Sequence, residues 1–213
     1  MIRGAIFDMD GTLLDSMGVW DTVAQDYLIQ QGISPPADLL ERTRPMSMQQ
    51  CADYFCMELG VSKAAPQIVD AVLQIMADHY RYDLPLKPQA AALLSRLHQQ
   101  GVRLCVCTAS DRQLAQAALS RLGVLDNFDF LMTCGEEQLN KDSPEIFERA
   151  CARLGIAKSE TVVFEDALHA IRTAAQAGFR VVAVYDQTAA AAKEEICKLA
   201  EQYLYRLDEF KEE

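Results

Sequence analysis

Five short apolar runs constrain the fold of this 213-residue chain more than any other feature. Within each run the apolar residues are nearly continuous rather than alternating with polar ones, which is typical of strands covered on both faces. We therefore expect five buried strands, at residues 4–7, 103–107, 129–133, 161–164 and 180–185.

Helical segments separate the last four of these runs, and each segment ends at a glycine. A glycine just past the last helical turn is a common helix stop, because it adopts the left-handed conformation without steric cost. Ser143 followed by Pro144 also has the composition of a helix start. The repeated order of helix, glycine and strand predicts an α/β fold with a doubly wound, Rossmann-like, parallel sheet of five strands.

The interval between the first two runs is different, because it contains several amphipathic helices and no convincing strand. Ser47 and Gln50 form a capping box at the start of one of these helices. About seventy residues is far more than a crossover connection needs. We expect residues 1–15 and 86–213 to form an α/β core, and residues 16–85 to form an inserted all-helical domain.

The charge and composition of the chain argue against several classes of binding partner. The formal net charge is −11, which argues against a nucleic-acid surface, since such a surface needs clustered basic residues. We expect no signal peptide, because the charged Asp8 follows residues 1–7 directly, and no apolar run reaches membrane-spanning length. Seven cysteines without a Cys-x-x-Cys pair favour reduced core cysteines over a disulfide framework or a zinc site. We expect a cytoplasmic protein, by default a monomer, that binds neither nucleic acid nor membrane.

Reactive side chains follow the predicted strands at the points where the strands end. In an open α/β sheet, ligands bind beyond the carboxyl ends of the strands, so these side chains should share one edge. The relevant segments are Asp8-Met9-Asp10-Gly11-Thr12 after the first strand, Thr108-Ala109-Ser110 after the second, Lys141 after the third and Glu165-Asp166 after the fourth.

This set of side chains suits phosphoryl transfer. Carboxylate oxygens from Asp8 and Asp166 are the hard ligands that Mg²⁺ prefers. A carboxylate can also attack phosphorus, and the metal together with Lys141 would cancel the repulsion between two anions. Asp10, two residues after Asp8, could protonate the leaving alcohol and then activate water.

Each of these motifs alone also has an ordinary structural interpretation. Asp8 to Thr12 could be a plain turn, although an EF-hand is excluded because Thr12 and Val19 occupy ligand positions. Thr108 could start a helix, and Lys141 could be a solvated surface lysine. Glu165-Asp166 could favour a helix dipole. Their joint placement at successive strand ends is what indicates a site.

At these residues the sequence resembles the haloacid dehalogenase-like (HAD) superfamily, in particular its branch of β-phosphoglucomutase-like and phosphoglycolate phosphatase-like enzymes with a helical cap. The resemblance covers essentially the whole chain. It implies that Asp8 is the nucleophile, forming an aspartyl-phosphate, and that Asp10 is the general acid/base. It further implies a Mg²⁺ ion held by the side chains of Asp8 and Asp166 and by the main-chain carbonyl of Asp10, with Glu165 supporting the ion through water.

By the same resemblance, the phosphoryl group binds to Gly11, Thr108, the amide of Ala109 and Lys141. The helical insertion resembles the family's cap, which covers the site and sets specificity. Arg44, in a cap loop, is a candidate ligand for a second anionic group of the substrate. Three positions depart from the family pattern, where Pro, Ser or Thr, and Gly are usual: Asp142, Ala167 and Ala170.

The cap also bears on the type of reaction. Phosphoglucomutases of this family carry an acid/base histidine at the place that Trp20 occupies here. We therefore expect a phosphatase that acts on a small phosphorylated metabolite. A phosphosugar mutase, and a non-enzymatic phospho-acceptor or binding protein, are the alternatives. The motifs do not choose among sugar phosphates, phosphoglycolate, nucleotides and cofactor phosphates.

Overall fold

The chain divides into two compact units. The computed structural model describes residues 2–43 and 46–212. One unit comprises Met1–Met17 and Leu84–Glu213, and the other comprises Gly18–Asp83.

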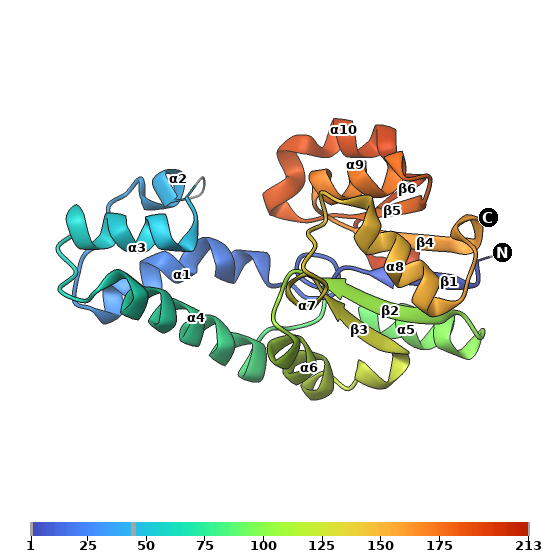
Figure 1. Cartoon of the computed structure of the whole chain (residues 1–213), viewed down its shortest axis with the longest axis horizontal. Coiled ribbons are helices and arrows are strands. Elements are labelled where there is room, and N and C mark those ends of the chain that lie inside the picture. The colour runs from blue at the N-terminus through green and yellow to red at the C-terminus, as the bar shows by residue number, and fades with distance from the viewer. Residues whose placement is uncertain (1, 44–45, 213) are drawn as a thin grey trace. The chain divides into compact units, whose positions relative to one another are not determined.

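The larger unit contains a parallel sheet of six strands (Figure 1). Their spatial order is β3-β2-β1-β4-β5-β6, and every neighbouring pair is parallel. This order places the first strand of the chain in the interior, between β2 and β4. The strands are β1 (Gly4–Phe7), β2 (Arg103–Thr108), β3 (Phe130–Thr133), β4 (Thr161–Glu165), β5 (Arg180–Val184) and β6 (Gln202–Leu204).

The doubly wound α/β fold is confirmed, but the predicted number of five strands is one too low. The sixth strand, β6, is three residues long and pairs with β5 through Val182 and Gln202. Such a short segment with a polar first residue has no strand periodicity of its own. It is a strand because the edge of β5 offers it backbone hydrogen-bonding groups, which only the folded sheet supplies.

Helices cover both faces of this sheet. One layer holds α8, α9 and α10, and the other holds α5 and α6 (Figure 1). As predicted, α8 starts with Ser143 as its cap and Pro144 in its first turn, and ends at Gly155 with a φ of 70°. The helices of this unit are α5 (Ala90–Gln99), α6 (Arg112–Arg121), α7 (Cys134–Glu137), α8 (Pro144–Leu154), α9 (Leu168–Gln176) and α10 (Lys193–Leu199).

The apolar strands are explained by burial on two sides. Ile6 and Val163 pack in one layer with Ile171 of α9. The alternate residues Phe7 and Phe164 face the other layer, where their rings stack with centroids 4.3 Å apart. Burying each such side chain contributes about 1.5–3 kcal/mol. Both faces of β1 and β4 are therefore closed to solvent, and only their ends can carry reactive groups.

Among its described residues, the smaller unit contains helices and connecting loops but no strand. It contains most of α1 (Met17–Gln30), with α2 (Leu39–Thr43), α3 (Met48–Met57) and α4 (Ala65–Tyr82). The capping box predicted for Ser47 and Gln50 is present at the start of α3. Tyr27 and Phe55 stack at the centre of the unit, with ring centroids 6.1 Å apart. Across the described residues, no helix has the length and apolarity needed to cross a membrane.

Candidate active site

The pairing of β1 with β4 explains why distant carboxylates meet. Phe7 is in register with Phe164, so the residues that follow them leave the sheet side by side. The N–H of Asp8 extends this ladder by donating to the carbonyl oxygen of Phe164 at 2.9 Å. Glu165 ends β4 and Asp166 follows it directly. Two segments more than 150 residues apart thus reach the same edge of the sheet.

The turn after Asp8 lies close to the Asp166 carboxylate, and Gly11 makes this close contact possible. Gly11 has a φ of 88°, in the left-handed region that favours glycine. A Cβ atom at Gly11 would lie 2.5 Å from Asp166 Oδ2, so any side chain at this position would collide with that carboxylate. The next residue, Thr12, donates a hydrogen bond from its hydroxyl to Asp166 Oδ1 at 2.9 Å. The turn therefore fixes the position of Asp166.

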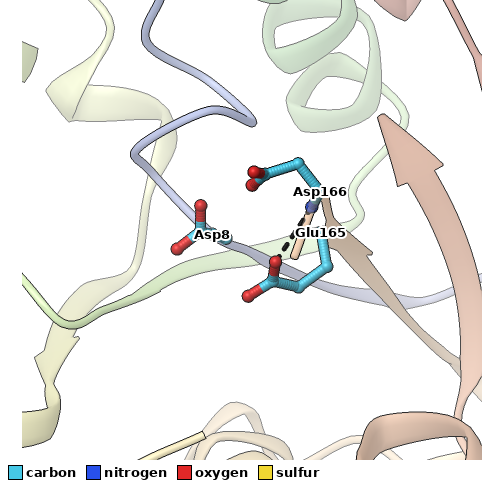
Figure 2. A group of neighbouring side chains, drawn as sticks. All are labelled: Asp8, Glu165 and Asp166. Carbon is cyan, nitrogen blue, oxygen red and sulfur yellow. Dashed lines mark hydrogen bonds between the residues drawn. The ribbon is translucent and has the colours of Figure 1, made fainter. Parts of the chain in front are cut away.

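Three buried carboxylates form the centre of the site: Asp8, Glu165 and Asp166. One oxygen of each lies within 4.8 Å of the others (Figure 2). Lys141, also buried, donates a short hydrogen bond to Asp8 Oδ1 and a 2.6 Å bond to Glu165 Oε1. When all four groups are ionised, three negative charges face one positive charge. The cluster therefore carries a net charge that suits a divalent cation.

The unpaired oxygen of Asp8 supports the same conclusion. Among the described residues, Asp8 Oδ2 is buried and has no hydrogen-bond partner. A buried carboxylate oxygen without a partner is costly, so such atoms occur mainly where a ligand or ion completes them. Oxygen donors from carboxylates are the ligands of hard cations. The residues at this site therefore fit a divalent metal ion.

Burial and like charges shift the protonation of the site. Burial raises the pKa of Asp8 to about 7; Lys141 opposes this shift, and Glu165 and Asp10 add to it. Burial, with Glu165 and Asp8, also raises the pKa of Asp166 well above its usual range. Burial alone would lower the pKa of Lys141, but Asp8 and Glu165 hold it well above its usual range. Without a cation, the cluster thus retains a proton near neutral pH.

Asp10 is oriented by two hydroxyl groups. Ser16 Oγ donates to Asp10 Oδ1 at 2.7 Å, and Ser110 Oγ donates to Asp10 Oδ2 at 2.6 Å. No pattern in the sequence predicted a role for either serine. Both belong to motif segments at strand ends, but a hydroxyl's choice of partner depends on the fold. The two bonds hold this carboxylate in one orientation beside Asp8.

Comparison with known proteins identifies the family. Residues 2–178 match the model of the haloacid dehalogenase-like hydrolases. The chain belongs to this family. The predicted superfamily, and with it the prediction of a hydrolytic enzyme, is confirmed.

Curated relatives of this HAD hydrolase extend over most of its length. It is 29% identical to validoxylamine A 7'-phosphate phosphatase of Streptomyces hygroscopicus subsp. limoneus, over 84% of this chain and 83% of that protein. It is also 29% identical to the fructose-1-phosphate phosphatase YqaB of Escherichia coli (strain K12), over 85% of this chain and 95% of that protein.

A solved structure supports the fold of this HAD hydrolase. The putative β-phosphoglucomutase of Thermotoga maritima superposes with a TM-score of 0.85, covering 98% of this chain and 96% of that chain. The two sequences are 21% identical, so the similarity concerns the fold alone.

The remaining motif residues of this HAD hydrolase occupy the same edge. Thr108 is buried at the end of β2, next to β1, and its hydroxyl accepts a hydrogen bond from the N–H of Ser110 at 3.0 Å. Ala109, between them, is exposed. The predicted contact residue Arg44 lies outside the described residues. The structure thus brings Asp8, Lys141, Glu165 and Asp166 into one cluster and places Asp10 and Thr108 at its border.

The departures from the family pattern are accommodated locally. Ala167 is the cap of α9 and has no side-chain oxygen to satisfy the first turn. Glu165 Oε2 accepts from the N–H groups of Asp166 and Ala167, each at 2.9 Å, and so orders the segment that leads into α9; the bond to Asp166 is dashed in Figure 2. Asp142 is exposed and its N–H donates to Asn140 Oδ1. Ala170 is fully buried in the core. None of these substitutions removes a charged group from the site.

Proposed function

We propose that this HAD hydrolase is a magnesium-dependent phosphatase that acts on small phosphorylated metabolites through an aspartyl-phosphate on Asp8. The observation that carries the proposal is the state of the Asp8 carboxylate. It is buried at the end of an interior strand, with one oxygen bonded to Lys141 and the other without a partner among residues 2–43 and 46–212. The relatives are named as phosphatases, which supports the same reaction class.

The proposed metal site uses residues of both strand ends. The side chains of Asp8 and Asp166 and the main-chain carbonyl of Asp10 would hold Mg²⁺, with Glu165 acting through water. A bound Mg²⁺ lowers the electrostatic cost of bringing an anionic nucleophile to an anionic ester. Glu165 also contacts Lys141 at 2.6 Å, so it holds the lysine beside the reacting carboxylate.

The proposed reaction has two steps. A carboxylate oxygen of Asp8 attacks phosphorus, the ester bond breaks, and Asp10 donates a proton to the leaving alcohol. Asp10, now a carboxylate, then takes a proton from the water that attacks the aspartyl-phosphate. Lys141, the Thr108 hydroxyl and the Ala109 N–H would bind the phosphoryl oxygens. Gly11, whose lack of a side chain makes room for the Asp166 carboxylate, would lie beside the phosphoryl group at the turn.

We further propose that the substrate is a sugar or sugar-like monophosphate. This proposal draws on the names of the relatives, which act on fructose 1-phosphate and validoxylamine A 7'-phosphate. We also propose that residues 16–85 are the cap that selects the substrate, with Arg44 as a contact residue. Trp20, at the position of the mutase histidine, supports hydrolysis over phosphoryl return to the sugar.

The test is phosphate release from p-nitrophenyl phosphate with and without Mg²⁺. We expect turnover that depends on the metal and that Asp8→Asn abolishes, because an amide is not a nucleophile toward phosphorus. Asp70→Asn is the matched control, since Asp70 is an exposed residue of α4. A mutase would isomerise a sugar phosphate without releasing phosphate. An absence of turnover in the intact protein would contradict the proposal.

A further inference from the structure

A buried ion pair that the proposed reaction does not use lies at the carboxyl end of β5. Lys87 Nζ donates to Asp186 Oδ2 at 2.6 Å and to the carbonyl oxygen of Tyr185 at 3.2 Å. The side chains of Lys87 and Asp186 are almost completely buried. The other oxygen of Asp186 accepts from the N–H and the hydroxyl of Thr188 at 2.9 and 2.6 Å. Both carboxylate oxygens are therefore occupied, and the Lys87 side chain is held at a fixed point beside the sheet.

The backbone of Lys87 pairs with the segment that follows the proposed catalytic turn. The Lys87 N–H donates to the carbonyl oxygen of Leu13 at 2.8 Å, and the Asp15 N–H donates to the carbonyl oxygen of Pro85 at 3.0 Å. An antiparallel bridge lies between these two bonds. The Lys87 ammonium also lies 3.8 Å from Asp15 Oδ1. Residues 13–15 are thus paired with a segment whose own position depends on the Lys87 side chain.

Ser16 joins this paired segment to the proposed acid/base. It follows Asp15 directly, is fully buried, and donates a 2.7 Å bond from its hydroxyl to Asp10 Oδ1. A shift of residues 13–16 would move the hydroxyl that orients the Asp10 carboxylate. A displacement of about 1 Å in a reacting group can lower a rate about 10²-fold, even when its cause lies far from the chemistry. The position of this segment therefore matters for proton transfer.

A second cation keeps the returning segment attached when Lys87 is altered. Arg121 of α6 donates to the carbonyl oxygen of Leu84 at 2.6 Å, three residues before Lys87. The main-chain bonds to Leu13 and Asp15 do not involve the Lys87 side chain. Loss of the ion pair should therefore displace the segment slightly and leave it paired with the turn.

We propose that Lys87, through its ion pair with Asp186, is a positioning residue for Asp10. Asp186 fixes the Lys87 side chain, the Lys87 backbone fixes residues 13–15, and Ser16 at the end of that segment orients the Asp10 carboxylate. The proposal rests on the phosphatase function proposed above and concerns the proton given to the leaving alcohol. Lys87 itself takes no part in making or breaking bonds.

Two phosphate esters separate proton donation from the rest of the reaction. Phenyl phosphate releases a basic phenolate that needs a proton from Asp10, whereas 2,4-dinitrophenyl phosphate releases a stable anion that needs none. The constant to compare is kcat/KM with Mg²⁺, because it covers only the steps up to departure of the alcohol. A role of Lys87 in stability alone would not distinguish between the two esters.

The double variant Lys87→Met/Asp186→Asn tests the ion pair. It leaves neither charge without its partner, so it should be destabilised less than Lys87→Met. We expect kcat/KM for phenyl phosphate to fall about tenfold and that for 2,4-dinitrophenyl phosphate to change less than about twofold. Arg172→Met/Glu195→Gln, which removes an exposed ion pair in the same way, is the matched control and should change neither.

A milder variant keeps the test independent of the stability of the double variant. Thr188→Val removes only the hydroxyl bond to Asp186 Oδ1. We expect it to lower kcat/KM for phenyl phosphate about threefold, again with less than about twofold change for 2,4-dinitrophenyl phosphate. Thermal unfolding with Mg²⁺ shows that each variant is folded at the assay temperature.

A further measurement tests whether the effect depends on Asp10. In an Asp10→Asn background the acid is already absent, so adding Lys87→Met/Asp186→Asn should lower kcat/KM for phenyl phosphate by less than about twofold. Two residues that acted independently would instead show the full tenfold loss, about the same as in the unaltered protein.

The outcomes separate the two proposals. Equal losses on both esters, no loss on phenyl phosphate, or a full further loss in the Asp10→Asn background would overturn the role of Lys87 and leave the phosphatase function standing. An unaltered protein that hydrolyses neither ester with Mg²⁺ would overturn the phosphatase function itself.

Discussion

The Ser110 hydroxyl donates a 2.6 Å hydrogen bond to Asp10 Oδ2, joining two residues 100 positions apart in the chain. Ser16 occupies the other oxygen of the same carboxylate at 2.7 Å. Asp10 follows the proposed nucleophile by two residues, and its turn alone leaves the direction of its side chain open. The two serines supply that direction, and the bond from Ser110 connects the segments that follow β1 and β2.

Ser110→Ala should therefore lower kcat more than it changes KM. General acid–base catalysis contributes about 10²–10⁴-fold, and we expect the loss of one orienting bond to remove about tenfold of it. The measurement is steady-state hydrolysis of p-nitrophenyl phosphate. Ser120→Ala, on the exposed surface of α6, should leave both constants unchanged. An unaltered kcat in Ser110→Ala would show that the bond does not position Asp10.

Gly11→Ala should damage the metal site through a steric effect. The added methyl group would lie 2.5 Å from Asp166 Oδ2, at a φ of 88° that a side chain rarely adopts. We expect destabilisation by about 1 kcal/mol or more, together with a smaller rise of Tm on adding Mg²⁺. Gly18→Ala is the control, because no atom lies within 4 Å of its added carbon and Gly18 is in a helix. That variant should be stabilised by about 0.5–1 kcal/mol.

The stability of the metal-free protein should fall as the pH rises toward neutral. Asp8 has a pKa of about 7 in the folded chain, against its ordinary value of 3.8, so the folded state binds a proton that the unfolded state releases. The resulting stabilisation is complete below about pH 4 and is lost as the pH rises through about 7. Asp166, whose pKa is also raised, acts in the same direction.

Metal binding should reverse this trend, because a cation requires the ionised carboxylates. We expect the increase in Tm caused by Mg²⁺ to be larger at about pH 8 than at about pH 6. Asp8→Asn removes one titrating group and should flatten the pH dependence of the metal-free Tm. A Mg²⁺ effect of equal size at both pH values would contradict the raised pKa.

Lys87→Met should strongly destabilise the larger unit. Lys87 and Asp186 form an ion pair at 2.6 Å in which the side chains are only 10% and 4% exposed. Removing one partner of a buried pair leaves the other charge uncompensated, at a typical cost of about 3–5 kcal/mol. Arg172→Met is the comparison, because its pair with Glu195 is largely exposed and should contribute less than about 1 kcal/mol. Urea unfolding of both variants measures the difference, and similar losses would contradict the buried character of the first pair.

Local sequence patterns predicted some elements of this fold and missed others. The five longer strands and the start of α8 at Ser143 followed from local patterns, because burial on two faces and helix capping both leave signals within a few residues. The β6 strand had no such signal. Its backbone groups pair with β5, and that partner exists only once the sheet has formed.

The same distinction applies to the site: its residues could be predicted from local patterns, but their contacts could not. The sequence alone determined which residues stand at the strand ends, because parallel strands bring their carboxyl ends to one edge, and so it assembled Asp8, Lys141 and Asp166 as candidates. Only the tertiary structure decided which hydrogen-bond partners these side chains have. Glu165 accepts bonds from Lys141 and from the N–H of Ala167, which precedes α9, and Ser110 donates a bond to Asp10. Side-chain directions depend on the packing of segments far apart in the chain, and no local pattern of residues encodes them.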